Sequence, residues 1–173
     1  MAMSIRPARE DDFVAIAAIT NPYIVATAIH FGYDPVTAEE LAGAWRTGGY
    51  PWLVLDDDDG GVIGYAKAGV WRERAAYRWT AETGIYLAPA AHGKGLGTAL
   101  YSALLDELAR RGFRSVVTGI TLPNEASVRL HRRLGFVDAG VVREAGFKLG
   151  AWHDVSFRQK RLSSLPAGSP PSR

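Results

Sequence analysis

The chain has 173 residues, of which 47% are hydrophobic and 22% charged, as expected for one globular domain. A formal net charge of +2 is too small to indicate nucleic acid or a membrane surface as a partner. The chain contains no cysteine, which excludes disulfides, thiolate catalysis and cysteine-ligated metal sites.

Short elements are expected along the N-terminal third. The segment SIRPA (4–8) predicts an edge strand, and EDDFVAIAAITN (10–21) predicts a helix with acidic residues at its start and an apolar face. Residues 22–36 are rich in aromatic side chains and predict irregular structure. Thr37 and Glu40 have the spacing of a capping box, so a second helix should run from Thr37 to Trp45.

A β-hairpin should follow in residues 50–71, where two apolar runs flank the acidic turn DDDDGG. The aspartates 56–59 offer oxygen ligands for a metal, but consecutive side chains on a turn point in different directions. A solvated turn is therefore favoured. A third strand is predicted near residues 77–87.

The second half predicts alternating helices and strands. Leucines at 96, 100, 104 and 108 repeat at i+4, so this helix should pack on a sheet and end before Gly112. A buried strand (113–120), a short helix (124–134) stopped by Gly135, and two last strands (136–147 and 152–161) should follow. Residues 1–162 thus predict one mixed α/β domain with flanking helices, and the Pro- and Ser-rich residues 163–173 predict a flexible tail.

The segment AAHGKGLG (90–97) joins a strand to the leucine-striped helix. A glycine-rich turn at a helix N-terminus offers free backbone N–H groups to an anion such as pyrophosphate. The Walker A motif fails, because Gly95 stands where Ser or Thr must follow Lys94. The dinucleotide fingerprint also fails, because Thr98 or Leu100 stands at its third glycine. The pattern His92-x-x-Gly95-x-Gly97 remains, with a glycine turn that binds no ligand as the alternative.

This pattern resembles the R/Q-x-x-G-x-G/A pyrophosphate loop of the GNAT N-acetyltransferases, with His92 in the first position. LPNEASVRLHRRLGF (122–136) is similar to the second half of the same core, where an asparagine helps to hold the pantetheine arm. The resemblance implies a mostly antiparallel sheet with a splayed parallel pair, and acetyl-CoA as cosubstrate. The implied cofactor-binding residues are Ile85, Tyr86, Leu87, His92, Gly93, Lys94, Gly95, Leu96, Gly97, Thr98, Asn124 and Ser127.

Acetyl transfer to an amine needs a group that takes a proton and donors for the carbonyl oxygen. Glu82 lies on the strand that enters the glycine turn, where a carboxylate acts as a base if burial raises its pKa or a water relays the proton. His131 lies where many GNAT proteins carry a tyrosine thought to protonate the thiolate, and a histidine acts as acid or base near pH 7. The N–H groups of residues 85–87 are expected to be unpaired in an irregular strand and to contact the oxyanion. The alternatives are a surface glutamate on a strand and a helix-surface histidine, and the four histidines show no metal-ligand spacing.

The segment VWRERAAYRWTAE (70–82) places Arg72, Arg74 and Arg78 on one face if it is extended, although a bend at 73–76 would break that alignment. A solvated hairpin tip is the alternative. Guanidinium groups here would suit an anionic substrate.

This segment matches the pattern W-[KR]-x-R-x-A-Y-x-W-T-A-E of the phosphinothricin N-acetyltransferases, the herbicide-resistance branch, and the resemblance covers nearly the whole chain. Residues 146–155 match a second pattern, G-[YF]-K-x-G-x-W-H-D-V, and Asn21, Tyr23, Ile24 and Phe31 are in register, whereas Gly32 replaces a residue that is usually charged. The resemblance implies Glu82 and His131 as catalytic residues. The substrate-binding residues that it implies are Phe31, Arg72, Arg74, Tyr77, Thr83 and Gly84.

The sequence thus predicts an acetyl-CoA-dependent N-acetyltransferase for the α-amine of phosphinothricin-like amino acids, including methionine sulfoximine and methionine sulfone, with no metal. The alternatives are a GNAT-fold acyl-CoA-binding protein without turnover, and an acetyltransferase for another small amine or a protein N-terminus. The resemblance also implies a homodimer and a role in herbicide or antibiotic resistance. Since no apolar run approaches the roughly 18 residues of a membrane span and the N-terminus lacks a signal-peptide core, we expect a cytoplasmic protein.

Overall fold

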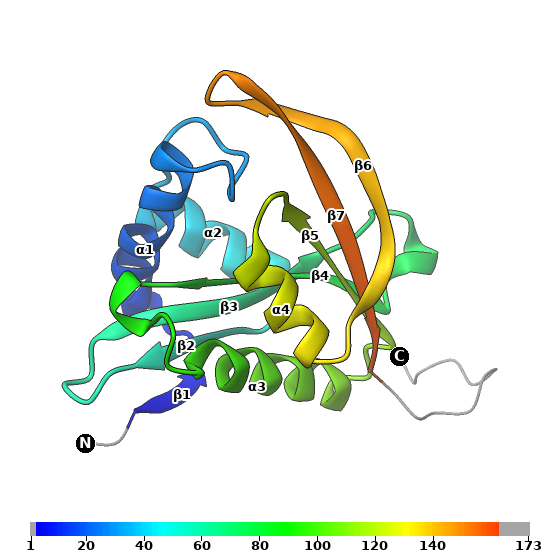
Figure 1. The fold of residues 1–173 in the computed structure, drawn as a ribbon. Coiled ribbons are helices and arrows are strands. Elements are labelled where there is room, and N and C mark those ends of the chain that lie inside the picture. The colour runs from blue at the N-terminus through cyan, green and yellow to red at the C-terminus, as the bar shows by residue number, and fades with distance from the viewer. Residues whose placement is uncertain (1–2, 163–173) are drawn as a thin grey trace.

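The structure, a computed structural model, describes residues 3–162 (Figure 1). Within this part of the chain one sheet has the strand order β1-β2-β3-β4-β5-β7-β6. The strands are β1 (Ser4–Pro7), β2 (Trp52–Asp56), β3 (Val62–Val70), β4 (Thr80–Leu87), β5 (Ser115–Thr121), β6 (Val137–Lys148) and β7 (Ala151–Arg161). The helices are α1 (Phe13–Ala26), α2 (Ala38–Gly48), α3 (Leu96–Arg110) and α4 (Glu125–Arg133). All strand pairs are antiparallel except β4 with β5, which confirms the predicted mixed sheet with one parallel pair.

Each face of the β2–β4 region carries its own core, because side chains alternate between faces along a strand. Leu53 and Leu55 of β2 belong to a cluster with α3, whereas Trp52 and Val54 belong to a cluster with α1 and α2. All four side chains are buried. The continuous apolar run in β2 is therefore explained by helices on both faces.

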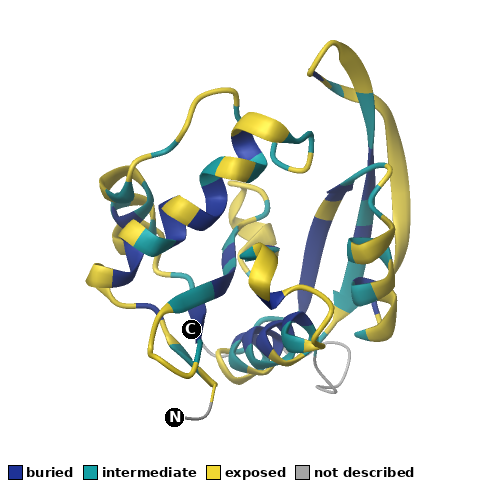
Figure 2. Ribbon diagram, turned by 60° about the vertical axis from the view of Figure 1, so that its left-hand side comes forward, coloured by how far each residue is buried: buried dark blue, intermediate teal, exposed yellow. Residues whose placement is uncertain are grey.

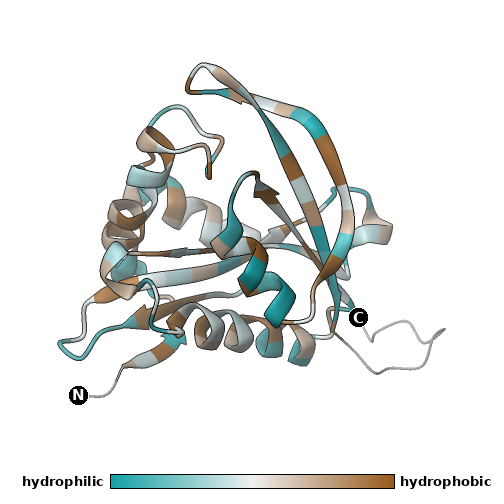
Figure 3. Ribbon diagram, viewed as in Figure 1, coloured by the Kyte–Doolittle hydropathy of each residue, from teal (hydrophilic) through white to brown (hydrophobic). Residues whose placement is uncertain are grey.

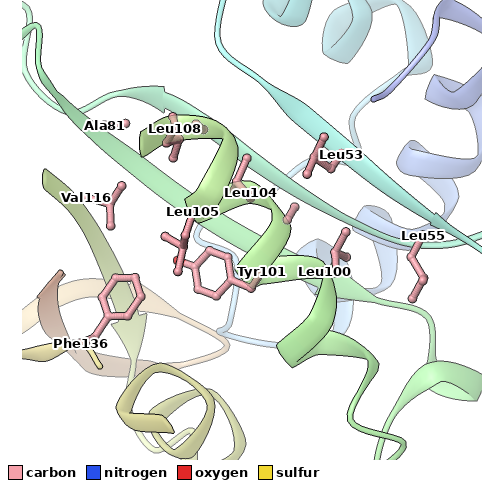
Figure 4. Packing of buried hydrophobic residues seen from close by; sticks show 12 residues of the cluster. Leu53, Leu55, Ala81, Leu100, Tyr101, Leu104, Leu105, Leu108, Val116 and Phe136 are labelled. Carbon is pink, nitrogen blue, oxygen red and sulfur yellow. The ribbon is translucent and has the colours of Figure 1, made fainter. Parts of the chain in front are cut away.

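The leucine stripe of α3 forms the centre of the larger cluster. Figure 4 shows Leu100 and Leu104 on the side of the helix toward β2, and Tyr101 on the side toward Phe136. Leu100, Tyr101, Leu104 and Leu108 are completely buried. The i+4 pattern thus predicted both the helix and the face that packs on the sheet.

Two boundaries in the N-terminal half differ from the prediction. α1 does not end at Asn21 but continues past Pro22 to Ala26, because burial of Ile24 outweighs the backbone hydrogen bond that a proline removes. α2 extends beyond Trp45 to Gly48, while the predicted capping box of Thr37 and Glu40 is present.

The aspartate run and the third strand also needed correction. Asp56 lies at the end of β2 and is buried, so only residues 57–59 belong to the turn that was predicted to be solvated. β4 begins at Thr80, not near Tyr77, because residues 75–77 form a 3₁₀ turn. The predicted tail, 163–173, lies outside the described residues.

β6 and β7 form a long hairpin at one edge of the sheet. Figure 2 shows β6 exposed along most of its length, and Figure 3 shows hydrophobic and hydrophilic segments alternating along the hairpin. No helix in residues 3–162 is long and apolar enough to cross a membrane. No group of three or more His, Asp or Glu side chains within this range is placed to hold a metal ion.

Arg6 connects three elements at the N-terminal edge of the sheet. Its guanidinium donates two hydrogen bonds of 2.8 Å to the Asp12 carboxylate and two, of 2.7 and 3.1 Å, to that of Asp56. Burial would raise the pKa of Asp12, but its bonds to Arg6 and to the Arg9 N–H lower that pKa overall. Both carboxylates are nearly buried, so they depend on this single cation.

We expect Arg6→Met to lower the free energy of unfolding by about 3 kcal/mol, because it leaves two buried carboxylates without their partner. Urea unfolding at pH 7 measures this change. Arg9→Met is the matched control, since Arg9 contacts Asp12 through its backbone N–H and carbonyl groups, which should remain in place. Equal stability of the wild type and Arg6→Met would contradict the expectation.

Candidate active site

The parallel strands β4 and β5 separate soon after they meet. They pair only at Thr80–Ser115, Ala81–Val116 and Glu82–Val117. Beyond these pairs lies a cavity of about 500 Å³ whose walls include residues 82–86 of β4 and 118–121 of β5. The gap between the two strands is therefore a place where a ligand can reach both faces of the sheet.

A second cavity of about 370 Å³ continues from the first toward the start of α3. The two cavities share Ile29, Ile85, Tyr86, Asn124 and Ser127 in their walls. Of the predicted cofactor-binding residues, all but Lys94 line this second cavity: Ile85, Tyr86, Leu87, His92, Gly93, Gly95, Leu96, Gly97, Thr98, Asn124 and Ser127. The fold thus brings residues from three separate segments to one groove.

The glycines of the loop meet two different requirements. Gly93 and Gly95 have φ angles of +74° and +76°, which a residue with a Cβ rarely adopts. A Cβ at Gly97 would lie 3.2 Å from the Leu87 side chain, so this glycine lets α3 begin close against β4. The loop therefore directs the first N–H groups of α3 toward the groove, where the helix dipole favours an anion.

His92 turns back toward the end of β4. Its Nε2 lies 3.1 Å from both the Leu87 carbonyl oxygen and the Tyr23 hydroxyl oxygen. Tyr23 donates a hydrogen bond of 2.6 Å to the same carbonyl. The His92 side chain thus anchors the loop to α1 and β4.

His131 of α4 is buried at the cavity wall and bonded through both ring nitrogens. Nδ1 donates to the Ser127 carbonyl at 2.7 Å, which leaves Nε2 to accept from the Tyr101 hydroxyl at 3.2 Å. The Tyr101 oxygen then accepts from the Thr83 hydroxyl at 2.7 Å. Burial lowers the pKa of His131, against the effect of the Ser127 bond, so the imidazole is neutral near pH 7.

Glu82 approaches the cavity from the opposite face of the sheet. Its neighbours Ala81 and Thr83 face α3, so alternation along β4 turns Glu82 toward the side of α1 and α2. Burial raises the pKa of Glu82, although Lys67 and Arg72 lower it in part. A carboxylate with a raised pKa is a stronger base than an ordinary glutamate.

The strand carrying Glu82 is regular, not irregular as predicted. The Ala88 N–H donates to the Ile63 carbonyl at 2.8 Å, and the β3–β4 register continues without a bulge. Because hydrogen-bonded pairs alternate along an antiparallel ladder, Tyr86 points its N–H toward β3, whereas Ile85 and Leu87 point theirs toward the gap. Of the three predicted N–H groups, Ile85 and Leu87 are thus the two available to a ligand.

The predicted substrate residues divide into two groups. Thr83 and Gly84 line the main cavity, but Phe31, Arg72, Arg74 and Tyr77 do not. The three arginines do not share a strand face, because β3 ends at Val70 and residues 71–79 form an exposed loop. The bend considered at 73–76 is the correct alternative.

Phe31 packs against the β6–β7 hairpin. A Cβ on Gly146 would lie 2.5 Å from its ring, so the phenyl group lies directly over this glycine. The Phe31 ring centroid is also 6.4 Å from that of His153. The neighbouring Ile29, not Phe31, lines the cavities.

Sequence reasoning missed much of the wall of the main cavity, including Trp52, Lys67 and Ile29. Lys67 had a usable signal, because it is the only charged residue in the apolar strand VIGYAKAGV. Trp52 and Ile29 had none, since an apolar side chain next to a cavity follows the same pattern as one in the core.

The comparisons with known proteins all indicate the same family. Residues 14–136 match the model of the acetyltransferase (GNAT) family. The chain is 42% identical to a phosphinothricin N-acetyltransferase of Streptomyces viridochromogenes, over 99% of this chain and 93% of the relative. It is 40% identical to an L-methionine sulfoximine/L-methionine sulfone acetyltransferase of Salmonella typhimurium, over 95% and 98%.

A crystal structure of a GNAT superfamily phosphinothricin acetyltransferase from Sinorhizobium meliloti, in complex with acetyl-CoA, superimposes with a TM-score of 0.93. The two sequences are 37% identical, and the match covers 98% of this chain and 94% of that one.

The buried, neutral His131 makes stability depend on pH. Below a pH of about 6.5 the unfolded chain binds a proton on this imidazole that the folded chain does not, so the free energy of unfolding should decrease as pH falls. The slope from this group is at most about 1.4 kcal/mol per pH unit. Burial also lowers the pKa of His30, so this residue should likewise decrease the free energy of unfolding as pH falls.

We expect His131→Gln to flatten the decline in stability between pH 7 and 5, and addition of His30→Gln to flatten it further. Urea midpoints across this range measure the slope. A slope in His131→Gln that equals the wild-type slope would refute the assignment, whatever the absolute stability of the variant.

Proposed function

The chain belongs to the acetyltransferase (GNAT) family, and from this premise we propose that it transfers the acetyl group of acetyl-CoA to the α-amine of phosphinothricin-like amino acids. Phosphinothricin, methionine sulfoximine and methionine sulfone are the acceptors to test, since curated relatives at about 40% identity carry these names. The observation that carries the proposal is the pair of connected cavities at the β4–β5 gap, one along the glycine loop and one beside Glu82.

The groove residues fit the coenzyme. The positive φ angles of Gly93 and Gly95 and the open start of α3 suit a pyrophosphate bound by backbone N–H groups. Asn124 caps α4 by accepting a hydrogen bond of 3.1 Å from the Ser127 N–H, which leaves its amide NH₂ group to face the groove. We assign the pantetheine arm to this groove. When bound, acetyl-CoA supplies a thioester that the amine attacks.

Protein groups on one face of the sheet act on the attacking amine, and groups on the other face act on the leaving thiolate. Glu82, with its raised pKa, takes the proton of the amine directly or through a water. The N–H groups of Ile85 and Leu87 stabilise the carbonyl oxygen as it becomes negative. His131 and the hydroxyl groups of Tyr101 and Thr83 form a hydrogen-bonded chain on the other face, which stabilises the leaving thiolate by hydrogen bonding until solvent protonates it.

We expect Glu82→Gln to lower kcat at least about 100-fold, the size of a typical general-base contribution, with little change in acetyl-CoA binding. Release of free thiol with methionine sulfone measures turnover, and calorimetry measures coenzyme binding. Glu73→Gln, in the exposed 71–79 loop, is the matched control. Undiminished turnover in Glu82→Gln would remove Glu82 from the mechanism.

The same assay separates the enzyme from an acyl-CoA-binding protein. The enzyme releases thiol only when an acceptor is present, whereas the binding protein retains acetyl-CoA with every acceptor. Acetylation of phosphinothricin would protect cells from that compound. We therefore also propose a role in resistance to it. The cytoplasmic location expected from the sequence stays a prediction.

We also propose that the protein is a homodimer. The β6–β7 hairpin exposes several apolar side chains along its length, and exposed apolar surface of this kind marks protein–protein contacts. They are Val137, Val141, Val142, Phe147, Leu149 and Trp152, with exposed fractions of 44–63%.

Sedimentation equilibrium should give twice the chain mass of 18.7 kDa. Val142→Glu should shift the equilibrium toward the monomer, because it places a charge in the apolar contact. Val14→Glu, at an exposed position of α1, should leave the dimer intact. A monomer at micromolar concentration in the wild type would contradict the proposal.

A further inference from the structure

Lys67 is a cation on the wall of the main cavity, and no anionic side chain in residues 3–162 contacts it. Its ammonium group lies 5.0 Å from the centre of the Trp52 ring. Among the ion pairs and side-chain hydrogen bonds of residues 3–162, none involves Lys67. Burial lowers the pKa of Lys67, and the charge of Glu82 partly opposes this shift. A partly buried cation without a partner is a site for an anion.

The register of β3 and β4 leaves room beside both charges. Lys67 stands opposite Gly84, and Glu82 stands opposite Gly69. A Cβ at Gly69 would meet nothing within 4 Å, and one at Gly84 would meet only the Tyr86 ring at 3.7 Å. The two charged side chains are diagonal neighbours on one sheet face, roughly 7–8 Å apart at the backbone. The empty glycine positions form a pocket between them.

We propose that Lys67 binds the α-carboxylate of the acceptor amino acid, while Glu82 faces its α-amine. The inference rests on the proposed function and deepens it, because it names the part of the substrate that this chain recognises. In an α-amino acid the two groups are bonded to one carbon, so they need a cation and an anion in close proximity. Lys67 and Glu82 supply this arrangement across the pocket.

Among the arginines of the 71–79 loop, Arg72 lies close enough to Glu82 to lower the pKa of that carboxyl, but it does so from outside the cavity wall. Arg72, Arg74 and Tyr77 are exposed and absent from the cavity wall. A substrate with a second anionic or polar end, such as a phosphinate or sulfone, extends away from the α-carbon. Lys67 therefore selects for the amino-acid end, and it selects against amines that lack a carboxylate.

The test compares two acceptors that differ only at the carboxylate: methionine sulfone and its α-carboxamide. In Lys67→Met we expect kcat/KM for methionine sulfone to fall about 10- to 100-fold, mainly through KM, because one charge-assisted interaction is lost. The value for the amide should change less than about threefold, the range of ordinary context effects. Lys67→Arg should restore most of the preference for the acid.

Two further variants make the outcome decisive. Lys67→Gln gives a second uncharged side chain in case Lys67→Met does not fold, and Arg78→Met removes an exposed cation outside the cavity and should retain the preference. Equal losses for acid and amide in the Lys67 variants would overturn the inference. An equal shift of both pH profiles would also overturn it, since Lys67 would then act only through Glu82.

A different result would contradict the proposed function itself. The wild type would bind acetyl-CoA but release no thiol with any amino-acid acceptor, and the inference about Lys67 would fall with it. Turnover by the wild type together with an unchanged acid preference in Lys67→Met would reject the inference alone.

Discussion

β4 and β5 share only three residue pairs, and the two connected cavities of the candidate site lie beyond the point where these strands part. A fully paired parallel sheet would bury the backbone of residues 83–87 and leave no route between its faces. Thr83 is the first β4 residue beyond the pairing, and its hydroxyl bonds to Tyr101 of α3 at 2.7 Å. The Tyr101 hydroxyl thus lies at the point of separation, where it is hydrogen-bonded to the side chains of Thr83 and His131.

The gap also keeps two titrating groups apart. Glu82 and His131 both line the cavity, yet they belong to opposite faces of the sheet. Burial moves their pKa values in opposite directions, up for the carboxylate and down for the imidazole, because it disfavours the charged form of each. In the proposed mechanism, the upward shift makes the Glu82 carboxylate a stronger base for the amine, and the downward shift keeps the His131 imidazole uncharged on the side of the leaving thiolate.

Local sequence signals predicted the parts of the site that depend on backbone conformation. The glycines of the loop, the leucine stripe of α3 and the asparagine at the start of α4 each have a local physical cause, and all three elements are present. The gap could not be predicted from residues alone, since nothing in TAETGIYL or SVVTGIT states where pairing stops. The sequence also could not decide between an extended strand and a bend in residues 71–79, because the spacing of the arginines fits both conformations.

The outer wall of the cavity depends on contacts between segments far apart in the chain. Asn21 holds Val36 through two hydrogen bonds of 2.9 and 3.0 Å, which closes the loop that carries Ile29. From the far end of the chain, the buried Lys148 ammonium donates to the carbonyl groups of Ile24 and His30. Ile29 lines both cavities, so these contacts hold in place a segment of the wall that the two cavities share. The β6–β7 hairpin therefore supports the wall of the main cavity without lining it, because its Lys148 holds the loop that carries Ile29.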